Sequence, residues 1–380
     1  MAKHPPISGA SIFDAMIKDN TAITMAANIR YIPGVAKGVF RAAKDTNSPL
    51  IIEIARSECN LDGGYTGYTP KTFAEQIQNV ADEVEYPYWS LHADHIGIKK
   101  DDAESMKATI NLVKAQIDAD FTSFGIDASH LFDFDGNTTK EQLQPNLNAT
   151  MVVAKYIEDE MSKNSYGLEV EVGEIGRTDE SGFVITTQDE AVTFIKELND
   201  ESIYPQVLAI SNGSAHGNIY DGEGRPIEQS SIDVEQTTEI VKALNEAYAS
   251  GIIKRPIRIA QHGITGTPLR IIAEDFPKGD IIKGNVATHF QNIVFDTIKN
   301  EVPDLYNEIY GWVIENYSSP GKTEEEVFGK NAKFALKQYF TDLNNLDQRI
   351  VDNIEAKTYT DCLEFFKPFN SIGKAKLIKI

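Results

Sequence analysis

One stretch of the chain, residues 89–126, reads WSLHADHIGIKKDDAESMKATINLVKAQIDADFTSFGI. It begins with a short apolar run over Trp89–Ala93, continues with an amphipathic pattern over Asp101–Ile117, and ends with a second apolar run over Phe121–Ile126. Short strands that alternate with amphipathic helices are typical of parallel sheets, in which each helix makes a right-handed crossover. This stretch therefore predicts one β–α–β unit.

The same alternation runs through most of the chain. Eight apolar runs are expected to be strands: Ala22–Ala26, Leu50–Ile54, Trp89–Ala93, Phe121–Ile126, Leu168–Val172, Gln206–Ile210, Ile257–Ala260 and Ile281–Lys283. Other helical patterns lie between them, over Phe73–Val84, Glu141–Met161, Gln188–Leu198, Val234–Ala249 and Pro268–Phe276. Eight such units fit an α/β fold of the (β/α)₈ TIM-barrel type better than an open sheet. No run leads into a Gly-x-Gly-x-x-Gly turn, so a dinucleotide-binding fold has no support.

The pattern changes after the eighth unit. Residues from Val302 to Ile380 have a helical pattern, with an interruption near Ser318–Lys322. We therefore expect a TIM-barrel catalytic domain over residues 1–300. A helical C-terminal extension over residues 301–380 is expected to pack on this barrel rather than to form a domain of its own.

The composition limits the partners and the location of the protein. The 380 residues include 36 Lys and Arg against 57 Asp and Glu, which gives a formal net charge of −21. Such a surface repels phosphates and anionic lipid, so we expect neither nucleic acid nor a membrane as a partner. Cys59 and Cys362 cannot form a disulfide framework, and the N-terminus has no signal-peptide pattern. These features predict a cytoplasmic protein.

Histidine and carboxylate side chains lie at the carboxyl ends of several expected strands. Four of the seven histidines lie there, in His92-Ala93-Asp94-His95, Ser214-Ala215-His216-Gly217 and Gln261-His262-Gly263. The active site of a TIM barrel lies at the carboxyl ends of its strands. Histidines from three strands, with carboxylates beside them, indicate a site for Zn²⁺ or a similar divalent ion. Three protein ligands would leave one coordination position open for substrate.

Two further patterns point to the same end of the barrel. Glu169 and Glu171 share one face of a strand, and burying both is costly unless a cation or a shared proton compensates. We expect one of them to bind metal and the other to be hydrogen-bonded. Gly263 and Gly266 allow the loop after the seventh strand to direct backbone N–H groups at an anion, and the helix expected from Pro268 adds its positive end.

These residues, in this order, resemble the metal-dependent class II fructose/tagatose-bisphosphate aldolase family. The resemblance runs from about Ala22 to Asn292 and is strongest in the His-x-Asp-His motif at residues 92–95. Glu-x-Glu-x-Gly, Ala-His-Gly, His-Gly and Lys-x-Asn elements follow in the family order. The resemblance implies a lyase that reversibly cleaves fructose 1,6-bisphosphate or tagatose 1,6-bisphosphate to dihydroxyacetone phosphate and glyceraldehyde 3-phosphate.

The resemblance also implies a metal site. His95, His216 and His262 would ligate Zn²⁺, or alternatively Co²⁺ or Fe²⁺, and the ion would polarise the ketose carbonyl. Asp127 and Glu171 match positions that hold a second cation, divalent or monovalent, in some members of the family.

Further roles implied by the resemblance concern the substrate. Asp94 would carry the proton of the hydroxyl from which the aldehyde forms, and either Asp179 or Glu180 would deprotonate the three-carbon unit. The partner would be a sugar phosphate, and the chain would form a homo-oligomer, a dimer or a tetramer. The positions that match substrate contacts are Ser57, Gly217, Gly263, Thr265, Asn285 and Thr288.

Three segments depart from the family pattern. Ile264 and Thr265 replace the second Gly and the Ser of His-Gly-Gly-Ser-Gly, and Ala287 replaces the Asp of Asn-x-Asp-Thr. The turn Asn60–Pro70 is similar instead to the companion subunit of tagatose-bisphosphate aldolase and to metal-dependent uronate epimerases. A sugar-acid (uronate) epimerase or aldolase and a non-catalytic partner subunit are therefore alternatives, and a Schiff-base aldolase that uses Lys283 is a weaker one.

Overall fold

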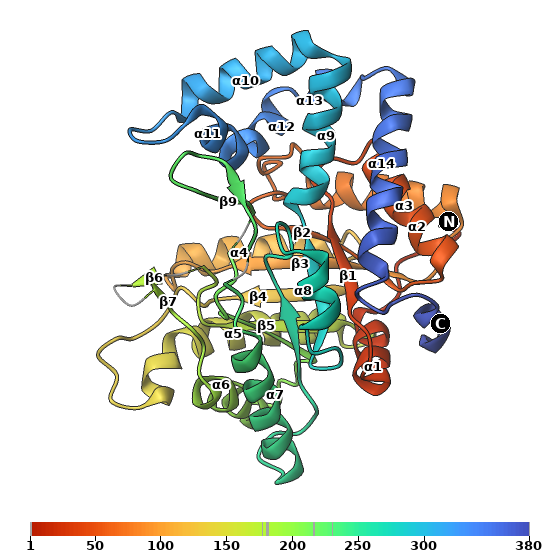
Figure 1. Cartoon of the computed structure of the whole chain (residues 1–380). Helices are drawn as coiled ribbons and strands as arrows, with labels where there is room; N and C mark the ends of the chain where they lie inside the picture. The colour runs from red at the N-terminus through yellow and green to blue at the C-terminus, as the bar shows by residue number, and fades with distance from the viewer. Residues whose placement is uncertain (1, 177, 180–181, 216, 230, 380) are drawn as a thin grey trace.

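Eight parallel strands close into a barrel in the computed structural model, which describes residues 2–176, 178–179, 182–215, 217–229 and 231–379 (Figure 1). The barrel strands are β1 (Thr24–Asn28), β2 (Leu50–Ala55), β3 (Trp89–Gly97), β4 (Ser123–Asp127), β5 (Gly167–Val172), β8 (Val207–Ile210), β11 (Arg258–Gln261) and β12 (Ile281–Val286). They neighbour one another in chain order, and β12 pairs with β1 to close the barrel. Each apolar run predicted from the sequence overlaps one of these strands, so the TIM barrel is confirmed.

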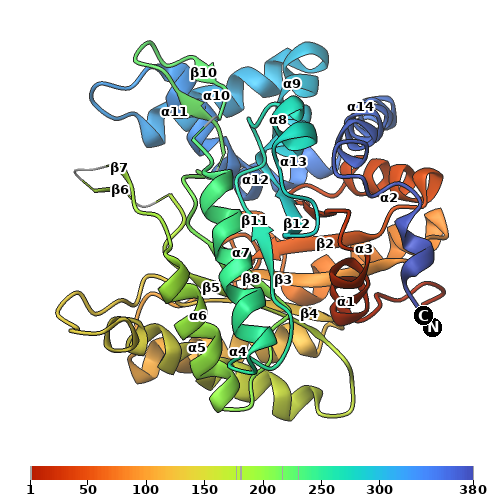
Figure 2. The same ribbon diagram turned by 60° about the horizontal axis from the view of Figure 1, so that its bottom comes forward.

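One helix follows each barrel strand. These helices are α2 (Val35–Thr46), α3 (Pro70–Val84), α4 (Ala103–Ile117), α5 (Thr139–Met161), α6 (Gln188–Asp200), α7 (Val234–Ala249), α8 (Leu269–Glu274) and α9 (Thr288–Glu301). Figure 2 shows α4, α5, α6 and α7 on the outside of the strands. Threonines at 69, 138 and 187 begin α3, α5 and α6 with capping boxes, which satisfy backbone N–H groups that lack helical partners. No helix in the described parts of the chain has both the length and the apolar character needed to cross a membrane.

Helix α1 (Gly9–Asp19) lies against the barrel strands and supplies apolar side chains to their interior. It contacts β3, β5 and β12, and Ile12, Phe13 and Met16 are almost fully buried. These side chains belong to one cluster with Ile51 and Ile282 from the strands. Burial of this apolar surface stabilises the barrel and gives the interior an apolar layer apart from the polar residues described below.

The chain after α9 is helical, as predicted. It contains α10 (Pro303–Tyr317), α11 (Glu324–Asn331), η1 (Ala332–Phe334), α12 (Ala335–Gln338), α13 (Phe340–Asn344), α14 (Gln348–Phe366) and η2 (Lys374–Leu377). The break between α10 and α11 lies at the interruption predicted from the sequence. Helix α14 packs against α2 and α9 (Figure 1). The division into a barrel domain and an extension at residue 300 stays a prediction.

Two short hairpins were not predicted from the sequence. They are β6 (Thr178–Asp179) with β7 (Gly182–Phe183), and β9 (Ile219–Tyr220) with β10 (Pro226–Ile227). The second hairpin lies against α11, where the ammonium of Lys330 is 5.5 Å from the ring centroid of Tyr220. Strands of two residues carry too little alternation to be recognised in a sequence.

Close packing of α14 on α2 leads to a stability prediction at Gly38. A Cβ atom added there would lie 2.7 Å from the carbonyl oxygen of Glu355 and 2.8 Å from Cβ of Thr358. We expect Gly38→Ala to lower the free energy of unfolding by about 1–3 kcal/mol, measured by urea denaturation, because the two helices must separate.

The matched control is Gly311→Ala in α10, where the added Cβ meets no atom within 4 Å. Alanine is the better helix former, so this variant is expected to gain about 0.5–1 kcal/mol. Equal stability of Gly38→Ala and the wild type would show that the contact between α2 and α14 is loose.

Candidate active site

The end of β3 is irregular where two of the predicted site residues lie. The pairing of β3 with β4 is shifted between Ala93 and Ile96, which marks a β-bulge. His95 has a φ of +39°, a left-handed conformation that few residues other than glycine adopt. Neighbouring side chains of a regular strand point to opposite faces, but a bulge redirects them. Asp94 and His95 consequently both line one cavity.

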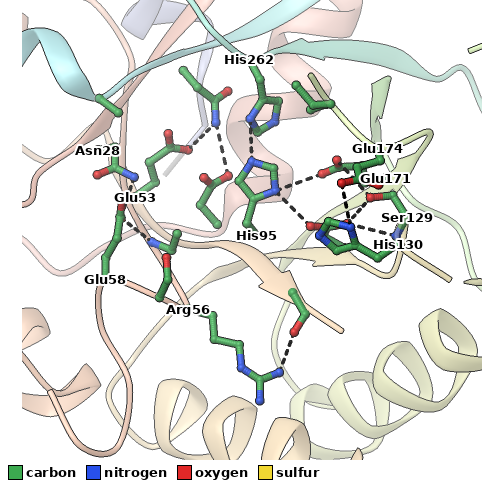
Figure 3. Close-up of a pocket in the computed structure, with 18 of the residues that line it drawn as sticks. Asn28, Glu53, Arg56, Glu58, His95, Ser129, His130, Glu171, Glu174 and His262 are labelled. Atoms are coloured by element: carbon green, nitrogen blue, oxygen red, sulfur yellow. Dashed lines mark hydrogen bonds and ion pairs between the residues drawn. The ribbon is translucent and has the colours of Figure 1, made fainter. Parts of the chain in front are cut away.

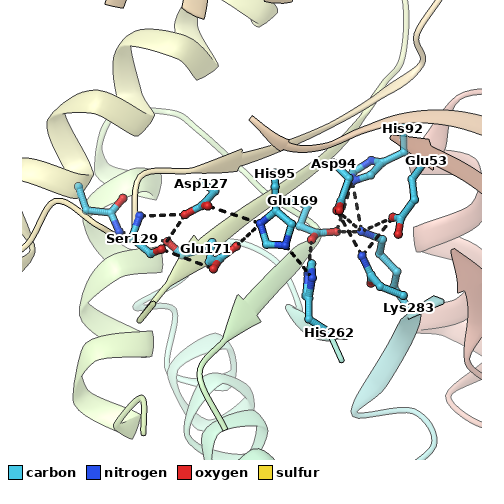
Figure 4. Close-up of polar contacts among 12 residues, drawn as sticks. Glu53, His92, Asp94, His95, Asp127, Ser129, Glu169, Glu171, His262 and Lys283 are labelled. Atoms are coloured by element: carbon cyan, nitrogen blue, oxygen red, sulfur yellow. Dashed lines mark hydrogen bonds and ion pairs between the residues drawn. The ribbon is translucent and has the colours of Figure 1, made fainter. Parts of the chain in front are cut away.

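A fully buried lysine lies among carboxylates inside the barrel (Figure 4). The Nζ atom of Lys283 on β12 is 2.8 Å from Oε2 of Glu169 and 3.1 Å from Oε2 of Glu53. The same Nζ atom is 3.3 Å from Oδ1 of Asp94 and 3.2 Å from Nε2 of His92. One ammonium therefore links β12 to β2, β3 and β5, and it faces three acidic groups.

The charges in this network control which groups are ionised. Burial alone would raise the pKa of Asp94, but Lys283 and the neighbouring histidines outweigh burial and lower it. Burial is likewise outweighed at Glu169, where Lys283 lowers the pKa to about 2. Burial and the charge of Asp94 raise the pKa of Glu53 well above its usual range. Asp94 is thus held as a buried carboxylate, whereas burial and the charge of Asp94 disfavour ionisation of Glu53.

His95 connects this network to a second group of side chains. Its Nε2 atom is 2.9 Å from Nδ1 of His262, and its Nδ1 atom is 3.0 Å from Oε2 of Glu171 and 3.4 Å from Oδ2 of Asp127 (Figure 4). Ser129 donates a hydrogen bond of 2.6 Å to Asp127. Burial and the charge of Asp127 raise the pKa of Glu171 to about 7. Both ring nitrogens of His95 therefore face groups that bind cations or protons.

Several sets of described side chains bring possible ligand atoms within 4.8 Å of one another: Asp94, His95 and His262; His95, Asp127 and Glu171; and Glu53, His92 and Asp94. Two nitrogens bound to one tetrahedral Zn²⁺ at about 2.0–2.1 Å lie about 3.3 Å apart. The ring nitrogens of His95 and His262 share a hydrogen bond of 2.9 Å, so a small separation of the rings, about 0.4 Å, would give this spacing. Imidazole nitrogens together with carboxylates fit a divalent transition ion.

All of these groups except His92 line one cavity of about 790 Å³ at the carboxyl ends of the strands (Figure 3). Such a volume suits a small-molecule ligand. Of the predicted site residues, Asp179 lies in β6, whereas Glu180 and His216 lie outside the described residues. The others all line the cavity: Ser57, Asp94, His95, Asp127, Glu171, Gly217, His262, Gly263, Thr265, Asn285 and Thr288.

The loop after β11 shows why glycine is needed at position 263. Gly263 has a φ of +71°, and a Cβ atom there would lie 2.5 Å from the carbonyl oxygen of Ala215. The loop is tied to α9 because Oγ1 of Thr265 accepts a hydrogen bond of 3.2 Å from the backbone N–H of His289. Helix α8 begins at Leu269 and has six residues, so it is shorter than the helix expected from the sequence. Anion binding by this loop stays a prediction.

The cavity also contains residues that the sequence analysis missed. Nδ1 of His130 is 3.1 Å from Oε1 of Glu174, and these two residues follow β4 and β5 (Figure 3). Arg56 follows β2 and donates hydrogen bonds of 2.7 Å to Gly97 and Thr109. The sequence could have indicated these residues through their positions just beyond the strand ends, because a TIM barrel places its functional groups there.

Histidines and carboxylates around one cavity at the strand ends are the arrangement of a TIM-barrel enzyme site. The chain belongs to the class-II fructose-bisphosphate aldolase family, whose sequence profile matches residues 8–374. The family resemblance predicted from the motifs is thereby confirmed.

Curated relatives match a shorter stretch. The D-tagatose-1,6-bisphosphate aldolase subunit GatZ of Klebsiella pneumoniae is 34% identical over 103 residues, which cover 26% of this chain and 24% of that protein. The GatZ of Salmonella newport is 30% identical over 103 residues, with the same coverage. The match thus spans about a quarter of the length of these relatives.

Solved structures share the whole fold. The fructose-bisphosphate aldolase Fba from Campylobacter jejuni aligns with a TM-score of 0.61 at 20% identity, over 98% of this chain and 97% of that one. The YdjI aldolase from Escherichia coli K12 aligns with a TM-score of 0.56 at 16% identity, over 97% of this chain and 99% of that one. At these identities the alignments show a common fold.

Proposed function

We propose that this chain is a metal-dependent aldolase that cleaves fructose 1,6-bisphosphate or tagatose 1,6-bisphosphate to dihydroxyacetone phosphate and glyceraldehyde 3-phosphate. The observation that carries the proposal is the position of Asp94, a buried carboxylate, beside the ring nitrogens of His95 and His262 in one cavity. A base next to metal ligands is what removal of a hydroxyl proton from a metal-held sugar requires.

The metal site of this proposal uses histidines from three strand ends. His95, His216 and His262 would hold Zn²⁺, or Co²⁺ or Fe²⁺ in its place, and Asp127 with Glu171 would accept a second cation. When bound, the ion polarises the ketose carbonyl and stabilises the negative charge that develops beside it. Glu171 and Asp127 orient the ring of His95 through its Nδ1 atom.

Carboxylates of the chain carry out the two proton transfers of the cleavage reaction. Asp94 takes the proton of the hydroxyl on carbon 4 as the bond between carbons 3 and 4 breaks, and that carbon becomes the aldehyde. The electron pair stays with the three-carbon fragment, which takes up a proton at carbon 3 from Asp179 or Glu180. Lys283 and Asn285 hold the carboxylate of Asp94 through contacts of 3.3 and 3.2 Å.

The chain acts on a sugar phosphate in the cytoplasm as a homo-oligomer, a dimer or a tetramer. Its described wall residues offer hydroxyl, amide and backbone N–H groups to the sugar and its phosphates: Ser57, Gly217, Gly263, Thr265, Asn285 and Thr288.

Metal binding is expected to stabilise the fold. Zn²⁺ at one hundred times its Kd should raise the free energy of unfolding of the metal-stripped protein by about 2.7 kcal/mol, measured by denaturation with and without the ion. His262→Ala should lose this gain. His289→Ala is the matched control, because the His289 ring pairs with Asp361 at 2.8 Å instead of lining the cavity, and it should keep the gain. Equal responses of the two variants would contradict the ligand assignment.

The likeness to GatZ favours a second candidate, a partner subunit of a tagatose-bisphosphate aldolase. The purified chain should decide between the two when it is assayed alone, with Zn²⁺, on both ketose bisphosphates and on a panel of uronates. Cleavage by the isolated chain supports the aldolase, and activity on uronates alone would support an epimerase. A chain that binds no metal and turns over no substrate would point to the partner subunit.

A further inference from the structure

Gln229 contacts the backbone next to two of the proposed metal ligands, although it belongs to none of the motifs that carry the family resemblance. It follows β10 in the segment that joins β8 to α7. Its side chain is 1% exposed and does not line the cavity. A glutamine that is buried so completely needs hydrogen-bond partners for its carbonyl and its NH₂ group, because an unpaired buried amide is costly.

The partners of this amide belong to two loops at the carboxyl end of the barrel. Oε1 of Gln229 accepts a hydrogen bond of 2.9 Å from the backbone N–H of Ala215. Its Nε2 atom donates a hydrogen bond to the carbonyl oxygen of Gly263. Ala215 precedes His216 in the sequence, and Gly263 follows His262. One side chain therefore connects the loops that contain two of the three histidines assigned to the metal.

Further contacts of Gln229 strengthen the same connection. Its backbone N–H donates a hydrogen bond of 2.9 Å to the carbonyl oxygen of Gly266, and its Nε2 atom lies 3.4 Å from Oγ1 of Thr267. A Cβ atom added at Gly263 would lie 2.5 Å from the carbonyl oxygen of Ala215 and 3.1 Å from Nε2 of Gln229. The two loops therefore pack backbone against backbone, and Gln229 holds the loop after β11 at several points.

The hydrogen bonds of the barrel sheet do not extend to this place. Within the described part of the chain, the pairing of β8 with β11 ends at Ala209 and Ala260, before either histidine. Side-chain amides connect the two segments beyond that point: Asn212 donates a hydrogen bond of 2.8 Å to Gln261, and Gln229 makes the next link. An amide side chain can do this because it carries a donor and an acceptor, as a backbone peptide group does.

We propose that Gln229 is a positioning residue, which holds the backbone beside His216 and His262 at the spacing that a single metal ion requires. The inference rests on the metal site of the proposed function, but not on its substrate. Because Gln229 does not line the cavity, it acts through Ala215 and Gly263. Side chains that support metal ligands from behind keep them in place, and their loss weakens metal binding.

The test measures the Zn²⁺ Kd of Gln229→Met by competition with a chromophoric chelator. Methionine has a similar length, so the variant removes the donor and the acceptor and changes the packing little. We expect the Kd to rise about 10–100-fold. The Co²⁺-loaded variant should also have an altered visible absorption spectrum, because this spectrum depends on the arrangement of ligands around the ion. Gln229→Glu is the second variant: it keeps the acceptor for Ala215 but cannot donate to Gly263, and its Kd should rise as well.

Gln206→Met provides the matched control. Gln206 directly precedes β8, at the opposite end of this strand, and is 6% exposed. Its Oε1 atom accepts a hydrogen bond of 2.8 Å from the backbone N–H of Leu168. Loss of this buried amide should lower the free energy of unfolding, as loss of Gln229 does, but it should leave the Zn²⁺ Kd unchanged.

The possible results separate this inference from the proposed function. It is overturned if the folded Gln229 variants bind Zn²⁺ as the wild type does, or if Gln206→Met weakens binding as much as Gln229→Met. A wild type that binds no Zn²⁺ would overturn the metal site and this inference together. Weakened Zn²⁺ binding by Gln229→Met, in a chain whose wild type cleaves no ketose bisphosphate, would overturn the aldolase reaction and leave this inference standing.

Discussion

Replacement of Asp94 by Asn is expected to lower kcat for ketose-bisphosphate cleavage by about 10²–10⁴-fold, the usual contribution of a positioned general base. Asparagine keeps the shape of the side chain, which is 3% exposed and lies between Lys283 and Asn285. It cannot accept the hydroxyl proton. KM should change little, because the groups proposed to contact the phosphates are untouched. Steady-state kinetics on both bisphosphates measure the effect.

Two measurements make this result specific to proton transfer. The variant should still be stabilised by Zn²⁺, which shows that the metal site survives. Asp135→Asn, on an exposed loop away from the cavity, should retain full activity. If Asp94→Asn holds metal and cleaves substrate at the wild-type rate, another group carries the proton and the assigned role is wrong.

Replacement of Lys283 by Met is expected to give the largest loss of stability, about 3–5 kcal/mol in the free energy of unfolding. The side chain is 0% exposed, and its ammonium is the cation that Glu53, Asp94 and Glu169 share. Methionine has a similar length, so the variant removes the charge with little change in packing. The buried carboxylates then repel one another without a counter-charge. Urea denaturation measures the difference.

A double-mutant cycle separates this charge effect from packing. Lys283→Met combined with Glu169→Gln should lose about 0.5–3 kcal/mol less than the sum of the two single variants, because the second change removes a charge that the first left unpaired. Strictly additive losses would show that Lys283 acts through packing alone.

The same lysine bears on the Schiff-base alternative. Burial would lower the pKa of Lys283, but Glu169, Glu53 and Asp94 outweigh burial and raise it, so the amine is held in its protonated form. A protonated amine is not a nucleophile. Borohydride with dihydroxyacetone phosphate should therefore fail to label the chain, whereas labelling that survives a chelator would support that alternative.

The barrel could be predicted from the sequence because the patterns that indicate each strand and helix lie within short segments of the chain. The apolar runs are short and nearly continuous, as in strands covered on both faces, and each is followed by a helical pattern. Predicted and observed bounds differ by up to a few residues, as Trp89–Ala93 against β3 shows. The grouping of Asp94, His95 and His262 at one rim followed from the fold, since parallel strands bring their carboxyl ends together.

Features that depend on contacts between segments far apart in the chain could not be predicted from the sequence. The bulge at His95 arises from a register shift between β3 and β4, and no local pattern reports it. The ammonium of Lys283 contacts acidic residues from three other strands, because closure of the barrel brings side chains at the same height of different strands together in its interior. Lys333 reaches the cavity from η1, and no pattern in the C-terminal sequence indicates that this part of the chain contributes to the cavity wall.

The backbone at His95 limits how this site can change over evolution. A φ of +39° is tolerated best by Gly, Asn, Asp and His, so the backbone restricts this position independently of the metal-binding role proposed for its imidazole. A relative that does not bind metal at this position would therefore still have few residues that fit its backbone conformation. Descendants that lost the chemistry should carry Gly, Asn or Asp there, and a β-branched residue at this position would signal that the bulge itself had disappeared.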